Sequence, residues 1–179
     1  MNQLKGYTVK QLQTAVRLLE QYNSASDAEV LHQLRVCLKK IKAVLDYLRT
    51  LHPKKIQSLR KKLQVVFHAA GSVREAQLHL KWLKEKRSYY LIQHASLDQK
   101  IKAEKELLFT QKKHHCKKLK TVCDKLGEYL KEAEEAGLLK YACGLREELE
   151  EKVSIIEKKD WHELRKLIKQ LLYAQHWIT

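Results

Sequence analysis

The sequence predicts an all-α protein, and three observations support this fold class. The 179 residues include one proline and five glycines, so few residues interrupt a helix. Apolar residues recur every three or four positions, which is the period of an amphipathic helix. No stretch alternates apolar and polar residues between turn dipeptides, as a half-buried strand would. Hydrophobic residues make up 44% of the chain, enough for a core, so disorder is not expected.

The first two helices are predicted in the N-terminal third. Residues 8–22 carry one apolar stripe at helical spacing, formed by Val9, Leu12, Val16 and Leu19. The letters NSAS at 23–26 end this helix. Ser26 followed three residues later by Glu29 is a capping-box pattern, so a second helix is expected from there to about Leu51.

Three further helical segments are expected along the rest of the chain. Pro53 suits the first turn of a third helix, where its missing N–H costs nothing, and Gly71 is expected to bend or split that helix. A long, very basic helix is expected from Ser96 to about Leu126. Short acidic helices should follow, separated by glycines at 127, 137 and 144, before a last helix that starts near Asp160.

The charge is large and unevenly distributed. The net charge is +15, but residues 128–157 hold nine acids and four bases, a net of −5, so the remainder carries +20. Such a field attracts polyanions, whether nucleic acid, an anionic membrane or a polymeric phosphate. No signal-peptide core or membrane-spanning apolar run is found, so the cytoplasm is expected and no membrane partner is predicted. The four cysteines have no C-x-x-C spacing and are expected to be reduced.

Two segments 130 residues apart share a pattern of basic residues. HQLRVCLKKIK at 32–42 and HELRKLIKQLL at 162–172 repeat His, Leu, Arg and Lys at matching offsets. At 100° per residue, the basic residues of the first copy fall within an arc of roughly 80°. These residues are His32, Arg35, Lys39 and Lys42, and their counterparts in the second copy are His162, Arg165 and Lys169, followed by His176. Each helix therefore has an apolar side for packing and a cationic side that can follow a row of phosphates. The competing interpretation is an ordinary solvated lysine face.

Arg74 is a second unusual residue. Leu63, Phe67 and Ala70 form an apolar stripe, and Arg74 falls where this stripe would continue. A guanidinium at the edge of a core needs a partner. Glu75 points about 100° away on a helix, so the expected partner is another acid or an anionic ligand.

Together, HQLRVCLKKIK, AAGSVRE and HELRKLIKQLLY resemble the motifs of the conserved histidine α-helical domain (CHAD) family, in matching order from His32 to Tyr173. The resemblance implies antiparallel helical bundles in two pseudo-symmetric halves, about 1–95 and 96–179, within one CHAD-like domain. It also implies a basic cavity, lined by the two His-x-x-Arg-x-x-x-Lys helices, that binds inorganic polyphosphate without catalysis. The implied ligand contacts are His32, Arg35, Lys39, Lys42, Arg74, His162, Arg165 and Lys169. A cytoplasmic location at polyphosphate granules would follow.

The sequence departs from the family pattern at three positions. Ala70 stands in place of Leu, Glu75 in place of Asp, and Leu172 in place of the basic residue before Tyr173. A second Gly-x-x-Arg element, expected after the second motif, is not found before Thr179. We therefore expect an incomplete second half.

No catalytic, metal or cofactor site is predicted. Glu148, Glu150 and Lys152 match a Glu-x-Glu-x-Lys metal motif that requires a strand, but the segment has helical periodicity, which separates the two carboxylates by about 200°. Cys116 and Cys123 lie among cations that oppose a bound metal. We therefore expect a binding protein rather than an enzyme.

Two other functions stay open at this point. A helical protein that binds single-stranded RNA or DNA would need aromatic residues exposed among cations. Trp82, Tyr89 and Tyr90 lie near Lys84, Lys86 and Arg87 and fit that description. A scaffold that recruits a protein through its acidic segment is the third alternative.

Overall fold

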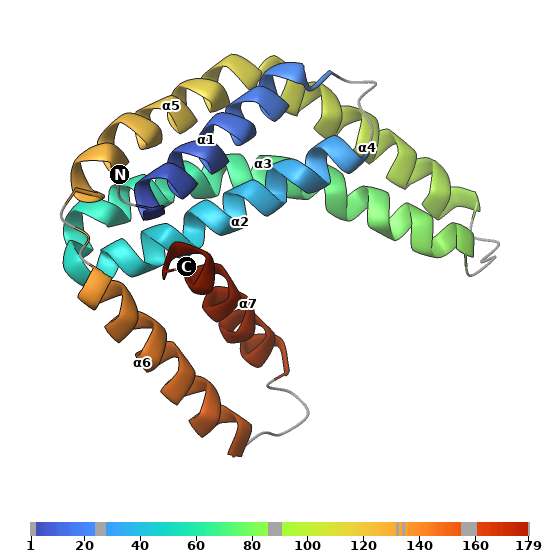
Figure 1. Cartoon of the computed structure of the whole chain (residues 1–179). Helices are drawn as coiled ribbons and strands as arrows, with labels where there is room; N and C mark the ends of the chain where they lie inside the picture. The colour runs from blue at the N-terminus through green and yellow to red at the C-terminus, as the bar shows by residue number, and fades with distance from the viewer. Residues whose placement is uncertain are drawn as a thin grey trace.

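The computed structural model describes residues 3–23, 28–85, 91–131, 133, 135–154 and 161–178. In these ranges the chain forms seven helices and no strand (Figure 1), which confirms the all-α prediction. The helices are α1 (Gln3–Gln21), α2 (Ala28–Leu51), α3 (Pro53–Glu85), α4 (Leu91–Thr110), α5 (Lys112–Tyr129), α6 (Glu135–Ser154) and α7 (Trp161–Ile178). Ser26 and Asp160, predicted to cap and to begin helices, lie outside the described residues.

Four helices form the body of the molecule. α2 packs against α1 and α3, and α5 packs against the same two helices. The core between them contains Leu12, Leu34, Leu63 and Leu119, one from each helix and each at most 2% exposed. Burial of one such side chain stabilises the fold by about 1.5–3 kcal/mol. α2 is the central element, because every residue from 43 to 48 is buried.

α3 is one helix of 33 residues that begins at Pro53, as predicted, and runs through Gly71 without a break. Gly71 therefore does not split this helix, which was one of the two expected outcomes; a bend at Gly71 stays a prediction. A Cβ built on Gly71 would lie 2.5 Å from Nη1 of Arg35 in α2. The glycine thus leaves room for a side chain of the neighbouring helix.

The predicted basic helix from Ser96 to Leu126 is divided into α4 and α5 at Gln111, whose φ and ψ are −85° and 1°. The backbone N–H of Gln111 still donates to Leu107, so the chain changes direction without losing this bond. The bend lets α4 follow α3 while α5 turns along α1 (Figure 1). Nζ of Lys112 donates to the carbonyl oxygen of Tyr22 (3.0 Å), just beyond the end of α1, which holds the bend in place.

The acidic segment is also simpler than predicted. The structure has one helix of 20 residues, α6, in place of several short ones, and Gly137 and Gly144 lie inside it. Each internal glycine costs about 1 kcal/mol of helix propensity, so packing must compensate. Nε2 of Gln170 in α7 donates to Oη of Tyr141 in α6 (2.8 Å) and ties the two helices together.

α6 and α7 form a hairpin that joins the body through α7 (Figure 1). Trp177, near the end of α7, is 2% exposed and packs against Tyr7 of α1 and Tyr47 of α2, each with a ring-centroid distance of 6.3 Å. The two predicted halves, 1–95 and 96–179, stay a prediction. The contacts of α5 with α1 and α3 join helices from both sides of that boundary.

Two further observations concern membrane-spanning helices and the cysteines. No described helix is both long and apolar enough to cross a membrane. All four cysteines are free thiols, and Cys37 and Cys116 are buried in the core.

Candidate functional site

A groove of about 660 Å³ separates the α6–α7 hairpin from the body. α2 supplies one wall and α7 the other, while Phe67 of α3 and two residues of α6 complete the lining. The lining residues are Lys39, Lys42, Ala43, Asp46, Phe67, Glu148, Lys152, His162, Glu163, Arg165, Lys166, Leu167, Lys169, Gln170 and Tyr173. The two basic repeats thus supply opposite walls of one groove.

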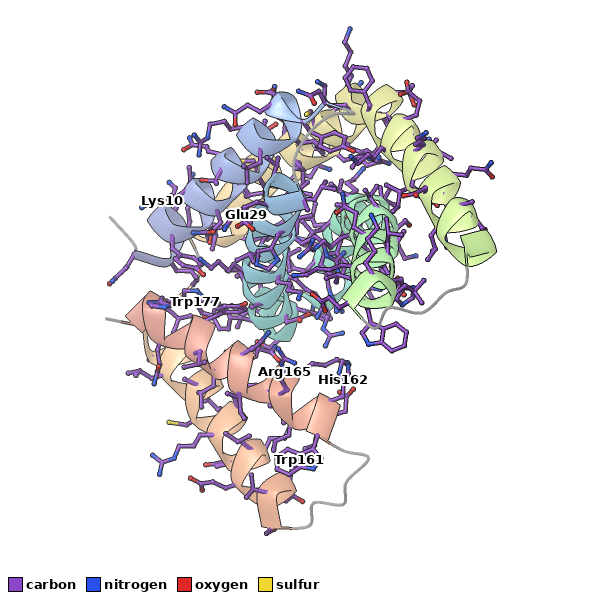
Figure 2. All side chains as sticks on the ribbon, turned by 90° about the vertical axis from the view of Figure 1, so that its right-hand side faces the viewer. Lys10, Glu29, Trp161, His162, Arg165 and Trp177 are labelled. Atoms are coloured by element: carbon purple, nitrogen blue, oxygen red, sulfur yellow. The ribbon has the colours of Figure 1, made fainter. Side chains whose placement is uncertain are left out.

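Five of the eight predicted contact residues line this groove: Lys39, Lys42, His162, Arg165 and Lys169. Figure 2 shows Arg165 and His162 on the side of α7 that faces α2 and α3. The other three predicted residues, His32, Arg35 and Arg74, are not part of the lining. His32 is exposed, whereas Arg35 and Arg74 are half-buried.

Arg35 is fixed against α3 behind the groove. Its guanidinium lies 4.2 Å from the ring centroid of Phe67, and its Nη1 donates to the carbonyl oxygen of the same residue (3.0 Å). Burial lowers the pKa of Arg35, Glu75 raises it, and Arg74 lowers it further. Phe67 is itself a lining residue, so Arg35 adds a positive charge directly behind the wall of the groove.

Arg74 has no ion-pair partner in the described part of the chain. The positive charge of Arg74 lowers the pKa of Arg35. The expected acidic partner is therefore not found there, and Arg74 adds to the positive potential around Arg35.

The groove lining also includes three acidic residues, and each of them forms an ion pair with a lysine. Lys42 pairs with Asp46 (Nζ to Oδ2, 2.8 Å), Lys152 with Glu148 (2.7 Å) and Lys166 with Glu163 (2.6 Å). Asp46 is 9% exposed and also forms an ion pair with Arg60 of α3 (Nη2 to Oδ1, 3.0 Å). These pairs cancel half of the positive charges that line the groove.

Three cations of the lining form no ion pair with any residue that the structure describes. Lys39, Arg165 and Lys169 have no acidic partner among the described residues. The pKa of Lys39 is lowered, first by burial and then by Lys169, Arg35 and Arg165. The charges of α2 and α7 thus face one another at short range, and like charges in a cleft raise its potential.

Sequence reasoning did not predict several of the lining residues. Asp46, Glu148 and Glu163 were not expected to neutralise lysines in the groove, although each stands three or four residues from its partner, where helical side chains meet. Lys152 was noted only as part of the Glu-x-Glu-x-Lys pattern, and Gln170 was not singled out, because the sequence did not show which side of α6 or α7 would turn toward α2.

The segment that matches a metal motif is helical, as predicted. Glu148 and Glu150 lie in α6 and pair with Lys152 and Arg146 respectively, so they do not share a face. Within the described ranges, no three His, Cys, Asp or Glu residues are grouped so that they could hold a metal ion. His115 and Cys116 are both buried side chains of α5.

Comparison with known proteins places the chain in a family. No curated protein matches the sequence, and no solved structure matches it. The sequence model of the CHAD domain matches residues 8–178, which is nearly the whole chain and includes every helix that lines the groove. The chain therefore belongs to the CHAD domain family.

Proposed function

We propose that the protein binds inorganic polyphosphate in the groove between α2 and α7, without hydrolysing it. One observation carries the proposal: Lys39, Arg165 and Lys169 meet in the groove from two helices and have no acidic partner in the described structure. These cations repel each other in the free protein, and a polyanion removes that repulsion when it enters. The family resemblance points to the same ligand.

The chemistry of the ligand matches this arrangement. Polyphosphate is a linear polymer with a negative charge at each phosphate and no apolar part. Several phosphates can therefore contact separate cations, with an ammonium acting as a point charge and the Arg165 guanidinium as a two-pronged donor. Lys42 and Lys166 are already paired with Asp46 and Glu163. They add weaker contacts with the ligand, because each lysine must leave its carboxylate partner or share it.

The test is a titration of the purified protein with long-chain polyphosphate, ATP and single-stranded RNA at physiological salt. We expect polyphosphate to bind far more tightly than ATP, because ATP offers fewer successive phosphates. For single-stranded nucleic acids, the slope of log affinity against log salt is about −0.7 for each neutralised charge, and we expect polyphosphate to show a similarly steep dependence. Equal affinity for ATP and for the polymer would contradict the proposal.

The nucleic-acid alternative has one structural observation in its favour. Trp82 of α3 is 56% exposed, beside the exposed Lys81. Tyr89 and Tyr90, which the sequence also suggested for base stacking, lie outside the described residues. RNA binding that is lost in Trp82→Ala and kept in Arg165→Ala would favour this alternative. Polyphosphate binding that is lost in Arg165→Ala and kept in Trp82→Ala would support the groove as the binding site.

Binding without hydrolysis is the second part of the proposal. Cations that hold a phosphate chain bind the ground state as well as the transition state, so they do not by themselves accelerate cleavage. We expect no orthophosphate release from polyphosphate, with or without Mg²⁺. Metal-dependent release that disappears in Glu148→Gln would show instead that this groove carboxylate takes part in catalysis. In cells, we propose a cytoplasmic location at polyphosphate granules, which a fluorescent fusion would reveal.

A further inference from the structure

A second pocket, of about 200 Å³, lies between α2 and α3 beside the groove. Lys42 and Phe67 line both hollows, so the pocket and the groove are adjacent. The described residues that line the pocket include two cations, Lys42 and Arg60, and no acid. The pocket therefore extends the basic surface of the groove onto α3.

α3 contributes a row of polar side chains to this pocket. Arg60, Gln64 and His68 follow one another at four-residue spacing, and all three line it. At 100° per residue they fall within an arc of about 80°. Gln64 and His68 are exposed, and the amide nitrogen of the first lies 3.1 Å from Nε2 of the second. Leu38 and Leu63, each at most 2% exposed, form the floor. A ligand that enters therefore meets polar groups at the rim.

The two cations of the pocket are positioned by one carboxylate. Nζ of Lys42 lies 2.8 Å from Oδ2 of Asp46, and Nη2 of Arg60 lies 3.0 Å from Oδ1 of the same residue. An ammonium has three N–H donors and a guanidinium has five, so both cations keep donors for a phosphate. Asp46 is 9% exposed and so presents little negative surface to a ligand.

The connection between the groove and the pocket is also positive. Phe67 lines both hollows, and the guanidinium of Arg35 lies 4.2 Å from its ring centroid. A ligand that crosses Phe67 therefore passes close to a cation that lines neither hollow. This position lets Arg35 attract the ligand through its charge, without belonging to either lining.

We propose that a polyphosphate chain continues from the groove across Phe67 into the second pocket, where Arg60, Gln64 and His68 bind its further phosphates. This inference rests on the proposed function. The groove offers three cations that form no ion pair in the described structure, which is enough for a short oligophosphate. The pocket adds contacts that only a longer chain reaches. The affinity should therefore increase with chain length beyond what the groove alone provides.

Gln64→Glu tests the proposal by calorimetric titration with long-chain polyphosphate and with tripolyphosphate. The new carboxylate lies four residues from Arg60, where helical side chains meet, so it should neutralise this cation and repel a phosphate. The dissociation constant for the long chain should rise about tenfold or more, the loss expected for contacts with one charged group. Tripolyphosphate has three phosphates and matches the three unpaired cations of the groove. Its affinity should change about twofold at most, as for a charge about 10 Å away.

Val65→Glu is the matched control. Val65 is 44% exposed on α3 and lines neither hollow. It projects about 100° away from Gln64, and a glutamate there would meet Lys61 at the same four-residue spacing. The variant changes the net charge by the same amount, so it should weaken both ligands about twofold at most. Circular dichroism checks that both variants remain helical.

Arg165→Ala separates a failure of this proposal from a failure of the proposed function. Arg165 lines the groove and not the second pocket, so its loss should weaken the binding of both polyphosphates. If Gln64→Glu weakens the long chain no more than Val65→Glu does, or weakens tripolyphosphate equally, the extension into the second pocket is wrong and the groove still stands. If the wild-type protein binds neither polyphosphate, the proposed function fails, and this proposal fails with it.

Discussion

Lys169→Ala is the most discriminating test of how the groove binds its ligand. The ammonium of Lys169 lines the groove, and no acid in the described structure neutralises it. A hydrogen bond to a charged group is worth about 1.5–3 kcal/mol. Its loss should raise the dissociation constant for polyphosphate about 10- to 150-fold, since each 1.4 kcal/mol is a factor of ten. The salt slope should decrease by roughly 0.7, the value for one charge in single-stranded nucleic acids. Isothermal titration calorimetry at several salt concentrations measures both quantities.

Lys166→Ala is the matched control for this prediction. Lys166 is also a lysine of α7 in the groove, but its Nζ lies 2.6 Å from a carboxylate oxygen of Glu163. Removing it changes the net charge by the same amount without removing an uncompensated contact. A charge about 10 Å from the ligand contributes about 0.4 kcal/mol in a water-like dielectric, so we expect about a twofold loss. Equal losses in the two variants would refute the reasoning that only uncompensated cations bind directly.

Three other outcomes are expected. Gly71→Ala should change the free energy of unfolding little, because a helix-propensity gain of up to about 1 kcal/mol is offset by the loss of the contacts between Arg35 and Phe67. It should lower polyphosphate affinity, because the new Cβ displaces the guanidinium of Arg35; denaturant titration with calorimetry compares the two, and unchanged affinity would contradict this role of the glycine. Asp46→Asn should destabilise the free protein by about 1 kcal/mol and tighten polyphosphate binding, because Lys42 loses its carboxylate partner; weaker binding in calorimetry would be the opposite result. Burial lowers the pKa of His115 below its ordinary 6.5, so the unfolded chain binds the proton more readily than the folded chain does. The stability that is present above pH 6.5 should therefore be lost as the pH falls below 6.5. Thermal melts at several pH values should show this loss, and His115→Phe should reduce the loss.

The sequence was sufficient to predict the helical fold and the cationic walls of the groove, because both depend on periodicity within single helices. Lys39, Lys42, Arg165 and Lys169 share faces that the 3.6-residue period determines, so their direction was readable before the helices were packed. The start of α3 at Pro53 was predictable for the same local reason.

The features that the sequence did not reveal depend on contacts between helices. Gly71 looked like a helix breaker, but its role is set by Arg35 of another helix. The bend at Gln111 contains no proline or glycine, and it arises where the chain leaves α3 and follows α1. The neutralisation of Lys42 by Asp46 was visible as an i to i+4 spacing. Its importance for the ligand became clear only when both residues were found in the groove.

α7 is anchored to the body near its C-terminal end, so the hairpin can tilt about that end. Trp177 is clamped between aromatic rings of α1 and α2, whereas the opposite end of α7, at Trp161, is 60% exposed. These two residues are about 24 Å apart along the helix axis. A tilt of about 5° around Trp177 therefore moves the far end by roughly 2 Å, and the wall that carries Arg165 moves by a smaller amount. A small tilt of α7 therefore changes the width of the groove more than its other dimensions. The change is largest at the end near His162, which can adjust most to the width of a bound ligand.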